Sequence, residues 1–135
     1  MIEKHPVAEP AIRTPILRAK LHRPAVPADL VPRVALLQQL ERGRQRPLTL
    51  VSAPAGYGKS VLVSSWLETC ECASAWVSLD DEDNDLRQFL SYFLAAVETV
   101  APDAVRETRA LLDAATLPPL SRMASNLIND LDRID

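Results

Sequence analysis

The chain has no long apolar run, few cysteines and few histidines. None of its apolar stretches approaches the ~20 residues of a membrane span, and its first twenty residues lack the apolar core of a secretory signal. Cys70 and Cys72 form a lone C-x-C, and the two histidines, His5 and His22, lie far away. Zinc sites use four ligands in paired spacing, and a disulfide across two residues is strained, so we expect reduced thiols and no metal site there. The sequence predicts a cytoplasmic protein without membrane contact.

Aromatic residues are also scarce in the part of the chain that is basic. The formal net charge is −3, yet residues 1–46 hold nine Lys or Arg against four Asp or Glu, and residues 47–135 hold six against fourteen. A basic segment can bind nucleic acid, but these arginines are scattered among prolines without interleaved aromatics or a motif. Composition therefore does not favour DNA contact by this segment.

The spacing of apolar residues predicts one domain behind an extended leader. Six of the eleven prolines lie in residues 1–32, which we expect to be a basic, mostly extended leader. Behind it, short apolar runs bounded by turn residues predict buried strands, and apolar residues three and four apart predict helices. Strands alternating with helices are typical of an α/β fold with a parallel sheet. The expected strands cover residues 47–53 and 74–80, and the expected helices cover residues 33–43, 59–69, 86–100, 103–114 and 120–134.

A phosphate-binding motif follows the first expected strand. Seven of the eight positions of G-x-x-x-x-G-K-[ST] match at Ala53, Pro54, Ala55, Gly56, Tyr57, Gly58, Lys59 and Ser60. Small residues let backbone N–H groups turn around a phosphate, and the next helix adds its positive N-terminus. Lys59 would reach the β- and γ-phosphates, and Ser60 would bind Mg²⁺. The motif predicts an ATP or ADP site with Mg²⁺, and the alternative is a strand-to-helix turn of accidental composition.

An acidic run, residues 80–85, allows two interpretations. In one, Asp80 or Asp81 ends a strand and holds Mg²⁺ as the acid of a nucleotide site. In the other, Asn84 or Asp85 caps the next helix, whose dipole favours nearby carboxylates. We favour the helix cap because Ser78 interrupts the apolar run that the first interpretation needs.

Three stretches together resemble the N-terminal part of MalT-like, LuxR-type transcriptional regulators, from about residue 16 to residue 135. The stretches are KLHRPAVPADLVPRVALLQQL, LTLVSAPAGYGKSVLVSSWL and AWVSLDDEDNDLRQFLSYFLAAV. The order of residues in the second stretch is specific to this group, in which alanine is common at the position of Ala53.

The resemblance implies a STAND-class ATPase module. Its fold would be the P-loop NTPase-type three-layer α/β/α sandwich with a parallel sheet, here only its N-terminal part. Members of the family use ATP or ADP as a switch, self-associate when an inducer is present and bind promoter DNA through a C-terminal helix-turn-helix. Arg33 matches an arginine of the family that lies close to the nucleotide, although alone it would pass for a solvated residue at a helix start.

The sequence departs from the family pattern at its end. In the family, a third strand with the Walker B acids follows the helix matched by residues 120–135, and this sequence stops before it. We therefore expect residues 33–135 to be a truncated module that binds ATP without hydrolysing it. The alternatives are a small P-loop phosphotransferase that uses Asp80 or Asp81 as its metal acid, and a non-enzymatic interaction module.

Overall fold

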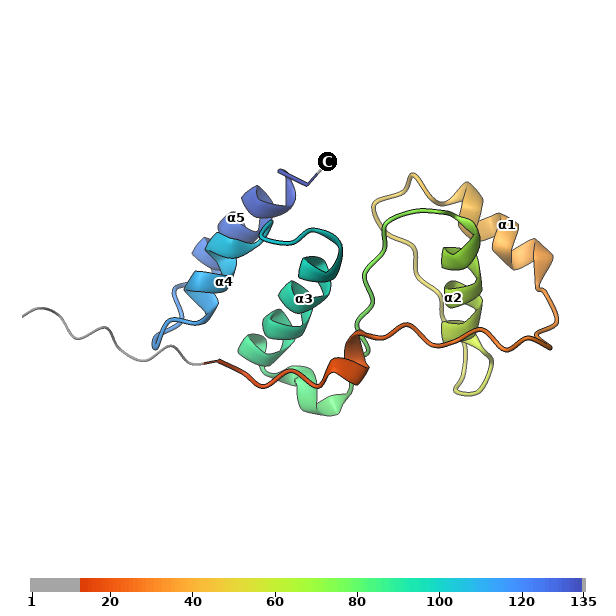
Figure 1. The fold of residues 1–135 in the computed structure, drawn as a ribbon, viewed down its shortest axis with the longest axis horizontal. Helices are drawn as coiled ribbons and strands as arrows, with labels where there is room; N and C mark the ends of the chain where they lie inside the picture. Colours follow the sequence, from red (N-terminus) through yellow and green to blue (C-terminus); the bar gives the residue numbers. More distant parts are fainter. Residues whose placement is uncertain (1–12, 135) are drawn as a thin grey trace, which may run out of the picture. The chain divides into compact units, whose positions relative to one another are not determined.

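The computed structural model describes residues 13–134, and the regular elements of this part of the chain are all helical (Figure 1). None of the described helices has the length and apolar character that crossing a membrane requires. The first twelve residues of the predicted leader, with His5, and Asp135 lie outside the described residues. The elements are the 3-10 helices η1 (Arg18–Leu21) and η2 (Asp81–Asn84) and the α-helices α1 (Val34–Arg42), α2 (Lys59–Thr69), α3 (Leu86–Val100), α4 (Arg106–Leu112) and α5 (Leu120–Leu131).

The predicted parallel sheet, and with it the three-layer α/β/α fold, is wrong. Residues 47–53 and 74–80, expected as buried strands, form no regular element and belong to no sheet in the described chain. Leu48 and Leu50 are 81% and 86% exposed instead of buried. The reason is that a strand exists only where a neighbouring strand pairs with its backbone. A short apolar run gives the character of its side chains and contains no information on such a partner.

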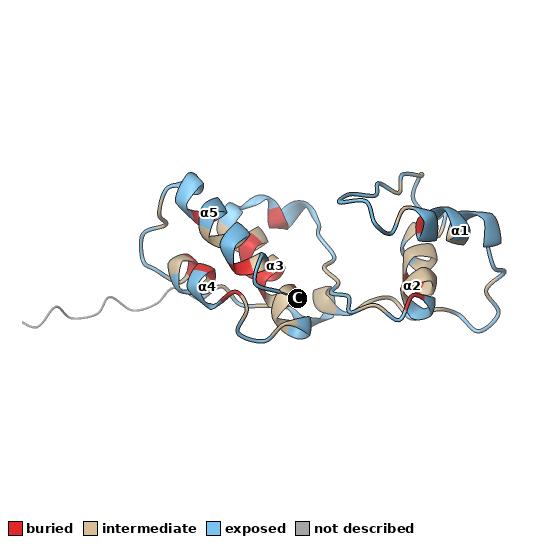
Figure 2. Cartoon of the chain, turned by 90° about the horizontal axis from the view of Figure 1, so that it is seen from above, coloured by how far each residue is buried: buried red, intermediate tan, exposed pale blue. Residues whose placement is uncertain are grey.

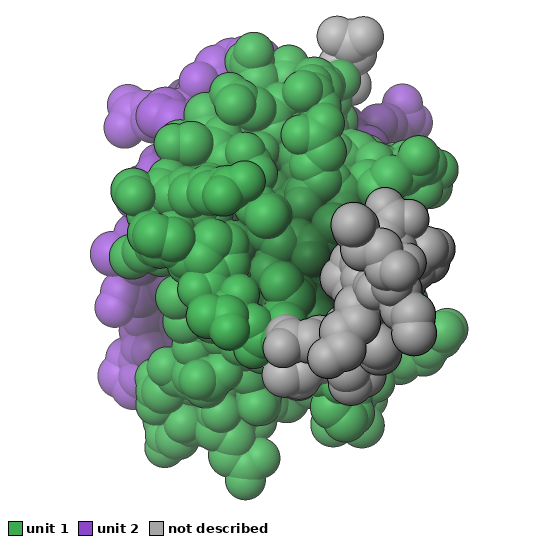
Figure 3. Space-filling model, turned by 90° about the vertical axis from the view of Figure 1, so that its left-hand side faces the viewer, with its two compact units in different colours: residues 1–22, 75–135 green, residues 23–74 purple. Residues whose placement is uncertain are grey.

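The chain divides into two compact units (Figure 3). The larger unit comprises residues 1–22 and 75–135, and the smaller comprises residues 23–74. Within the smaller unit, α1 contacts α2. Within the larger unit, α3 contacts η1, η2 and α4, and α4 contacts α5. Of the predicted leader, residues 13–22 thus belong to the larger unit and residues 23–32 to the smaller one.

The hydrophobic core of the larger unit lies between α3, α4 and α5 (Figure 2). Leu90 and Leu94, one turn apart on α3, are buried there. The predicted helix over residues 86–100 is confirmed to the residue, and Asp85 caps it by accepting a hydrogen bond from the backbone N–H of Gln88 at 2.9 Å. The remaining buried members of the core are Val105, Leu112 and Met123.

A disulfide joins Cys70 and Cys72, so the prediction of two reduced thiols is wrong. Cys70 ends α2, and Glu71 adopts a left-handed backbone conformation with a φ of 50°. This turn brings the two Cα atoms to 5.3 Å, within the usual range for disulfides.

A buried carboxylate connects α4 with α5. Asp130 of α5 is 1% exposed, and its Oδ2 atom accepts hydrogen bonds from the backbone N–H of Thr108 at 3.0 Å and from its hydroxyl at 2.7 Å. Thr108 lies in the first turn of α4, where backbone N–H groups lack partners within the helix. Asp130 therefore caps α4 from a neighbouring helix.

We expect Asp130→Ala to lower the free energy of unfolding by about 1–3 kcal/mol, because it leaves two buried donors without an acceptor. Asp130→Asn keeps an acceptor oxygen and should cost less. Urea denaturation followed by circular dichroism measures both variants, with Asp132→Ala as the control because Asp132 is the exposed C-cap residue of α5. An Asp130→Ala variant as stable as the wild type would contradict the capping role.

Candidate functional site

Two glycines shape the loop that carries the phosphate-binding motif. Gly56 and Gly58 have φ angles of 81° and 74°, in the left-handed region that favours glycine. A Cβ atom on Gly56 would meet no atom within 4 Å, so glycine is needed there for the backbone conformation and not for space. Gly58 is the N-cap of α2, and the loop therefore runs directly into the N-terminus of an eleven-residue helix.

Lys59 folds back over the beginning of this loop. Its Nζ atom donates hydrogen bonds to the carbonyl oxygens of Ala53 at 2.7 Å and Pro54 at 3.0 Å. Both acceptors are neutral, so the ammonium has no carboxylate partner among the described residues. Ser60, the next residue, is exposed, and so are Pro54 and Ala55.

Arg33 reaches the same loop from the start of α1. Its Nη1 atom donates a hydrogen bond to the carbonyl oxygen of Tyr57 at 3.0 Å, and its Nη2 atom lies 3.9 Å from the position of a Cβ on Gly58. The structure thus brings Arg33 together with the predicted loop, as the family resemblance implied. Two cationic side chains, Arg33 and Lys59, now belong to one site.

A cavity of about 280 Å³ lies beside the loop. Arg33, Tyr57 and Lys59 line it, together with apolar residues of α1 such as Leu36 and Leu40. Its volume is just under that of ordinary ligand pockets. The site can therefore offer two cations, loop N–H groups and an apolar wall to an anionic ligand.

The acidic run is organised around Lys20 rather than around an open ligand site. The Nζ atom of Lys20 lies 2.8 Å from Oδ2 of Asp80 and 2.7 Å from Oδ2 of Asp83. Asp80 also accepts a hydrogen bond from the N–H of Glu82 at 3.0 Å, while its own N–H donates to Asp83 at 2.9 Å. Asp80 and Asp83 thus form a capping box for η2, and the predicted helix cap of α3 falls to Asp85 and not to Asn84.

The ion pair shifts the pKa values of both partners. The hydrogen bond from Lys20 holds the pKa of the buried Asp83 carboxyl at about 2, below its ordinary 3.8, and the hydrogen bond with Asp80 raises the pKa of Lys20. Because the folded-state pKa of Asp83 is depressed, its stabilising contribution is present above the unfolded-state pKa and is lost as pH falls toward 2. No local sequence signal predicts this pair, because Lys20 and Asp83 are 63 residues apart.

Comparison with known proteins relates this chain to transcriptional regulators of the MalT type. The HTH-type transcriptional regulator MalT of Yersinia pestis is 32% identical over 120 residues, which is 89% of this chain and 13% of MalT. MalT of Yersinia pseudotuberculosis matches with the same identity and coverage. The chain is thus homologous to part of MalT.

A relative with a different name matches as well. The serine/threonine-protein kinase PknK of Mycobacterium tuberculosis is 39% identical over 97 residues, which is 69% of this chain and 9% of PknK. The chain therefore spans only about a tenth of the length of these relatives. No family model and no solved structure matches it.

We expect Lys20→Met to destabilise the larger unit at neutral pH, because it leaves the buried Asp83 carboxylate without its counter-charge. The difference in unfolding free energy between wild type and variant should shrink as pH falls from 4 to 2, since the wild type then loses the same interaction. Urea denaturation at several pH values measures this difference. Arg106→Met is the matched control, because its ion pair with Asp103 is exposed on both sides and contributes little. A difference that is constant with pH would show that Lys20 acts through packing alone.

Proposed function

We propose that this chain is the nucleotide-binding part of a MalT-like transcriptional regulator, in which ATP or ADP acts as a switch. The observation that carries the proposal is the meeting of Lys59 and Arg33 at a loop whose two glycines take left-handed conformations. Cations held by neutral carbonyl oxygens can exchange these acceptors for phosphate oxygens, which form stronger, charge-assisted hydrogen bonds.

Each residue of the motif has a role in this proposal. Backbone N–H groups of residues 55–60 and the N-terminus of α2 surround the phosphates, whereas Pro54 has no N–H to donate. Lys59 neutralises the β- and γ-phosphates, and the exposed Ser60 hydroxyl is a ligand for Mg²⁺. Arg33, whose guanidinium group donates a hydrogen bond to the carbonyl oxygen of Tyr57, contacts the nucleotide.

The two kinds of relative support a shared module rather than a shared overall activity. One carries the name of a kinase and the other that of a transcriptional regulator, yet both match this chain over a small part of their length. A segment common to both fits a switch that serves different output domains. We therefore assign promoter DNA binding, inducer binding and self-association to other parts of such a regulator.

Catalysis by this chain is not part of the proposal. The alternative of a small phosphotransferase uses Asp80 or Asp81 as its metal acid. Asp80 is bound by Lys20 at 2.8 Å, whereas Asp81 is exposed in η2 without such a partner among the described residues. We expect no ATP turnover by the purified chain. The alternative of a non-enzymatic interaction module expects no ATP binding and no effect of Lys59→Ala, so nucleotide titration distinguishes it from the proposal.

We expect the chain to bind a fluorescent ATP analogue in the presence of Mg²⁺, and Lys59→Ala to weaken this binding at least about tenfold, because a charge-assisted phosphate contact is lost. Titration followed by fluorescence anisotropy gives both dissociation constants. Arg46→Ala is the control, because Arg46 is an exposed cation of the same unit that lies outside the site. Equal affinity of the wild type and Lys59→Ala would rule out the proposed loop.

Gly58→Ala should also weaken nucleotide binding, because a Cβ at a φ of 74° costs roughly 1–2 kcal/mol and shifts the loop. Gly43→Ala is its control, since Gly43 ends α1 with a φ of −84°, a conformation that alanine accepts. Nucleotide titration and thermal unfolding of both variants separate an effect on the loop from an effect on the fold. A Gly58→Ala variant with unchanged affinity would show that the left-handed conformation is not required for binding.

A further inference from the structure

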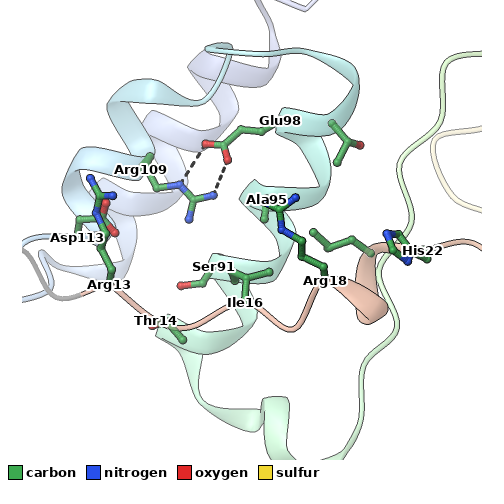
Figure 4. Close-up of a pocket in the computed structure, with 12 residues that line it drawn as sticks. Arg13, Thr14, Ile16, Arg18, His22, Ser91, Ala95, Glu98, Arg109 and Asp113 are labelled. Atoms are coloured by element: carbon green, nitrogen blue, oxygen red, sulfur yellow. Dashed lines mark hydrogen bonds and ion pairs between the residues drawn. The ribbon is translucent and has the colours of Figure 1, made fainter.

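A second cavity lies entirely within the larger unit, and no residue of the phosphate loop lines it. It is formed by residues 13–22, α3 and residues of α4 and its C-terminal end, and it has a volume of about 590 Å³ (Figure 4). This volume is in the range of sites for small molecules. Nothing in the proposed nucleotide function uses this cavity.

Cationic side chains outnumber carboxylates in its wall. Arg13, Arg18 and Arg109 line the cavity against Glu98 and Asp113. Guanidinium groups stay protonated at physiological pH, so the arginines carry their charges permanently. The wall therefore has an excess of positive charge.

One of these charges is held in place by an ion pair. Nε and Nη2 of Arg109 donate to the two carboxylate oxygens of Glu98 at 3.1 and 2.9 Å. This bidentate geometry fixes the plane of the guanidinium group and leaves Nη1 on the side away from Glu98 (Figure 4). Among the described residues, Nη1 of Arg109 has no hydrogen-bond acceptor.

Two hydroxyls of the wall are already bonded within α3, while Thr14, His22 and Asp113 complete its polar lining. The hydroxyls of Ser91 and Thr99 donate within α3, to the carbonyl oxygens of Arg87 and Ala96, each at 2.7 Å. Arg18 forms no ion pair or side-chain hydrogen bond with another described residue. Ile16, Leu21 and Ala95 supply apolar surface beside it.

We propose that this cavity binds a small organic anion, a carboxylate or a phosphate ester, through Arg18 and the free edge of Arg109. The fixed guanidinium of Arg109 provides a preorganised donor, and Arg18 provides the second positive charge. Apolar atoms of the ligand contact Ile16, Leu21 and Ala95. The site is independent of the phosphate loop, so it can exist whether or not the chain binds ATP.

Isothermal titration calorimetry of the full 135-residue chain with succinate and with glycerol 3-phosphate tests the proposal and separates the two sources of the anionic group. We expect millimolar or tighter binding of at least one probe, weakened about tenfold or more in Arg18→Gln because one charge-assisted contact is lost. Arg122→Gln is the matched control, because Arg122 is an exposed arginine of the same unit outside the cavity. Lys59→Ala is the second control and should leave this binding unchanged.

Several results would overturn the proposal. Absence of heat with both probes at millimolar concentration would show that the cavity does not select anions. Equal weakening in Arg18→Gln and Arg122→Gln would show only general electrostatic attraction. Binding lost in Lys59→Ala but kept in Arg18→Gln would assign the probe to the phosphate loop, which supports the proposed function and contradicts this inference.

Discussion

The ion pair of Lys20 with Asp80 and Asp83 is the interaction on which the larger unit depends. It connects the N-terminal segment to residues 60 and 63 positions away, and the carbonyl oxygen of Lys20 also accepts a hydrogen bond from the N–H of Ser78 at 2.8 Å. Asp83 also accepts a hydrogen bond from the side-chain amide of Gln88 at 3.1 Å, so the ion pair is linked to the first turn of α3, the helix that carries Leu90 and Leu94 into the core. The uneven charge of the sequence, basic first and acidic later, has part of its explanation here.

The cationic side chains of the structure differ in the acceptors that they bind, and this difference distinguishes structural cations from those proposed to bind a ligand. Lys20 is bound by two carboxylates, and that of Asp83 is buried. Removing Lys20 would leave the buried Asp83 carboxylate without a counter-charge. Lys59 and Arg33 are held only by backbone carbonyl oxygens, which are weaker acceptors than an anion. Arg109 is intermediate, because a carboxylate occupies two of its nitrogens and leaves the third. The same residue types are thus fixed by carboxylates at one place and held only by backbone carbonyl oxygens at another, and it is the latter that the proposed nucleotide site uses.

Features that depend on neighbouring residues could be predicted from the sequence, whereas features that depend on pairing between distant residues could not. The bounds of α2 and α3 were predicted correctly, because helical spacing and capping by Asp85 are decided within a few residues. The strands were predicted wrongly, because the backbone partner of residues 47–53 cannot be read from those residues themselves. The motif alone predicted the loop around Gly58. The family resemblance placed Arg33 close to a nucleotide, and its contact with the carbonyl oxygen of Tyr57 was not predicted. The pair of Lys20 with Asp83 had no local signal at all.

The glycines of the loop have a consequence for how the protein tolerates mutation. The chain has three glycines, and two of them lie one residue apart with left-handed backbones. Their positions are exposed or half-buried, and neither belongs to the apolar cluster of α3, α4 and α5, so replacing them leaves that cluster intact. Under the proposed function, a genetic screen for inactive but abundant protein would therefore collect substitutions at Gly56 and Gly58, whereas substitutions at Leu94 or Val105 would lower the amount of folded protein.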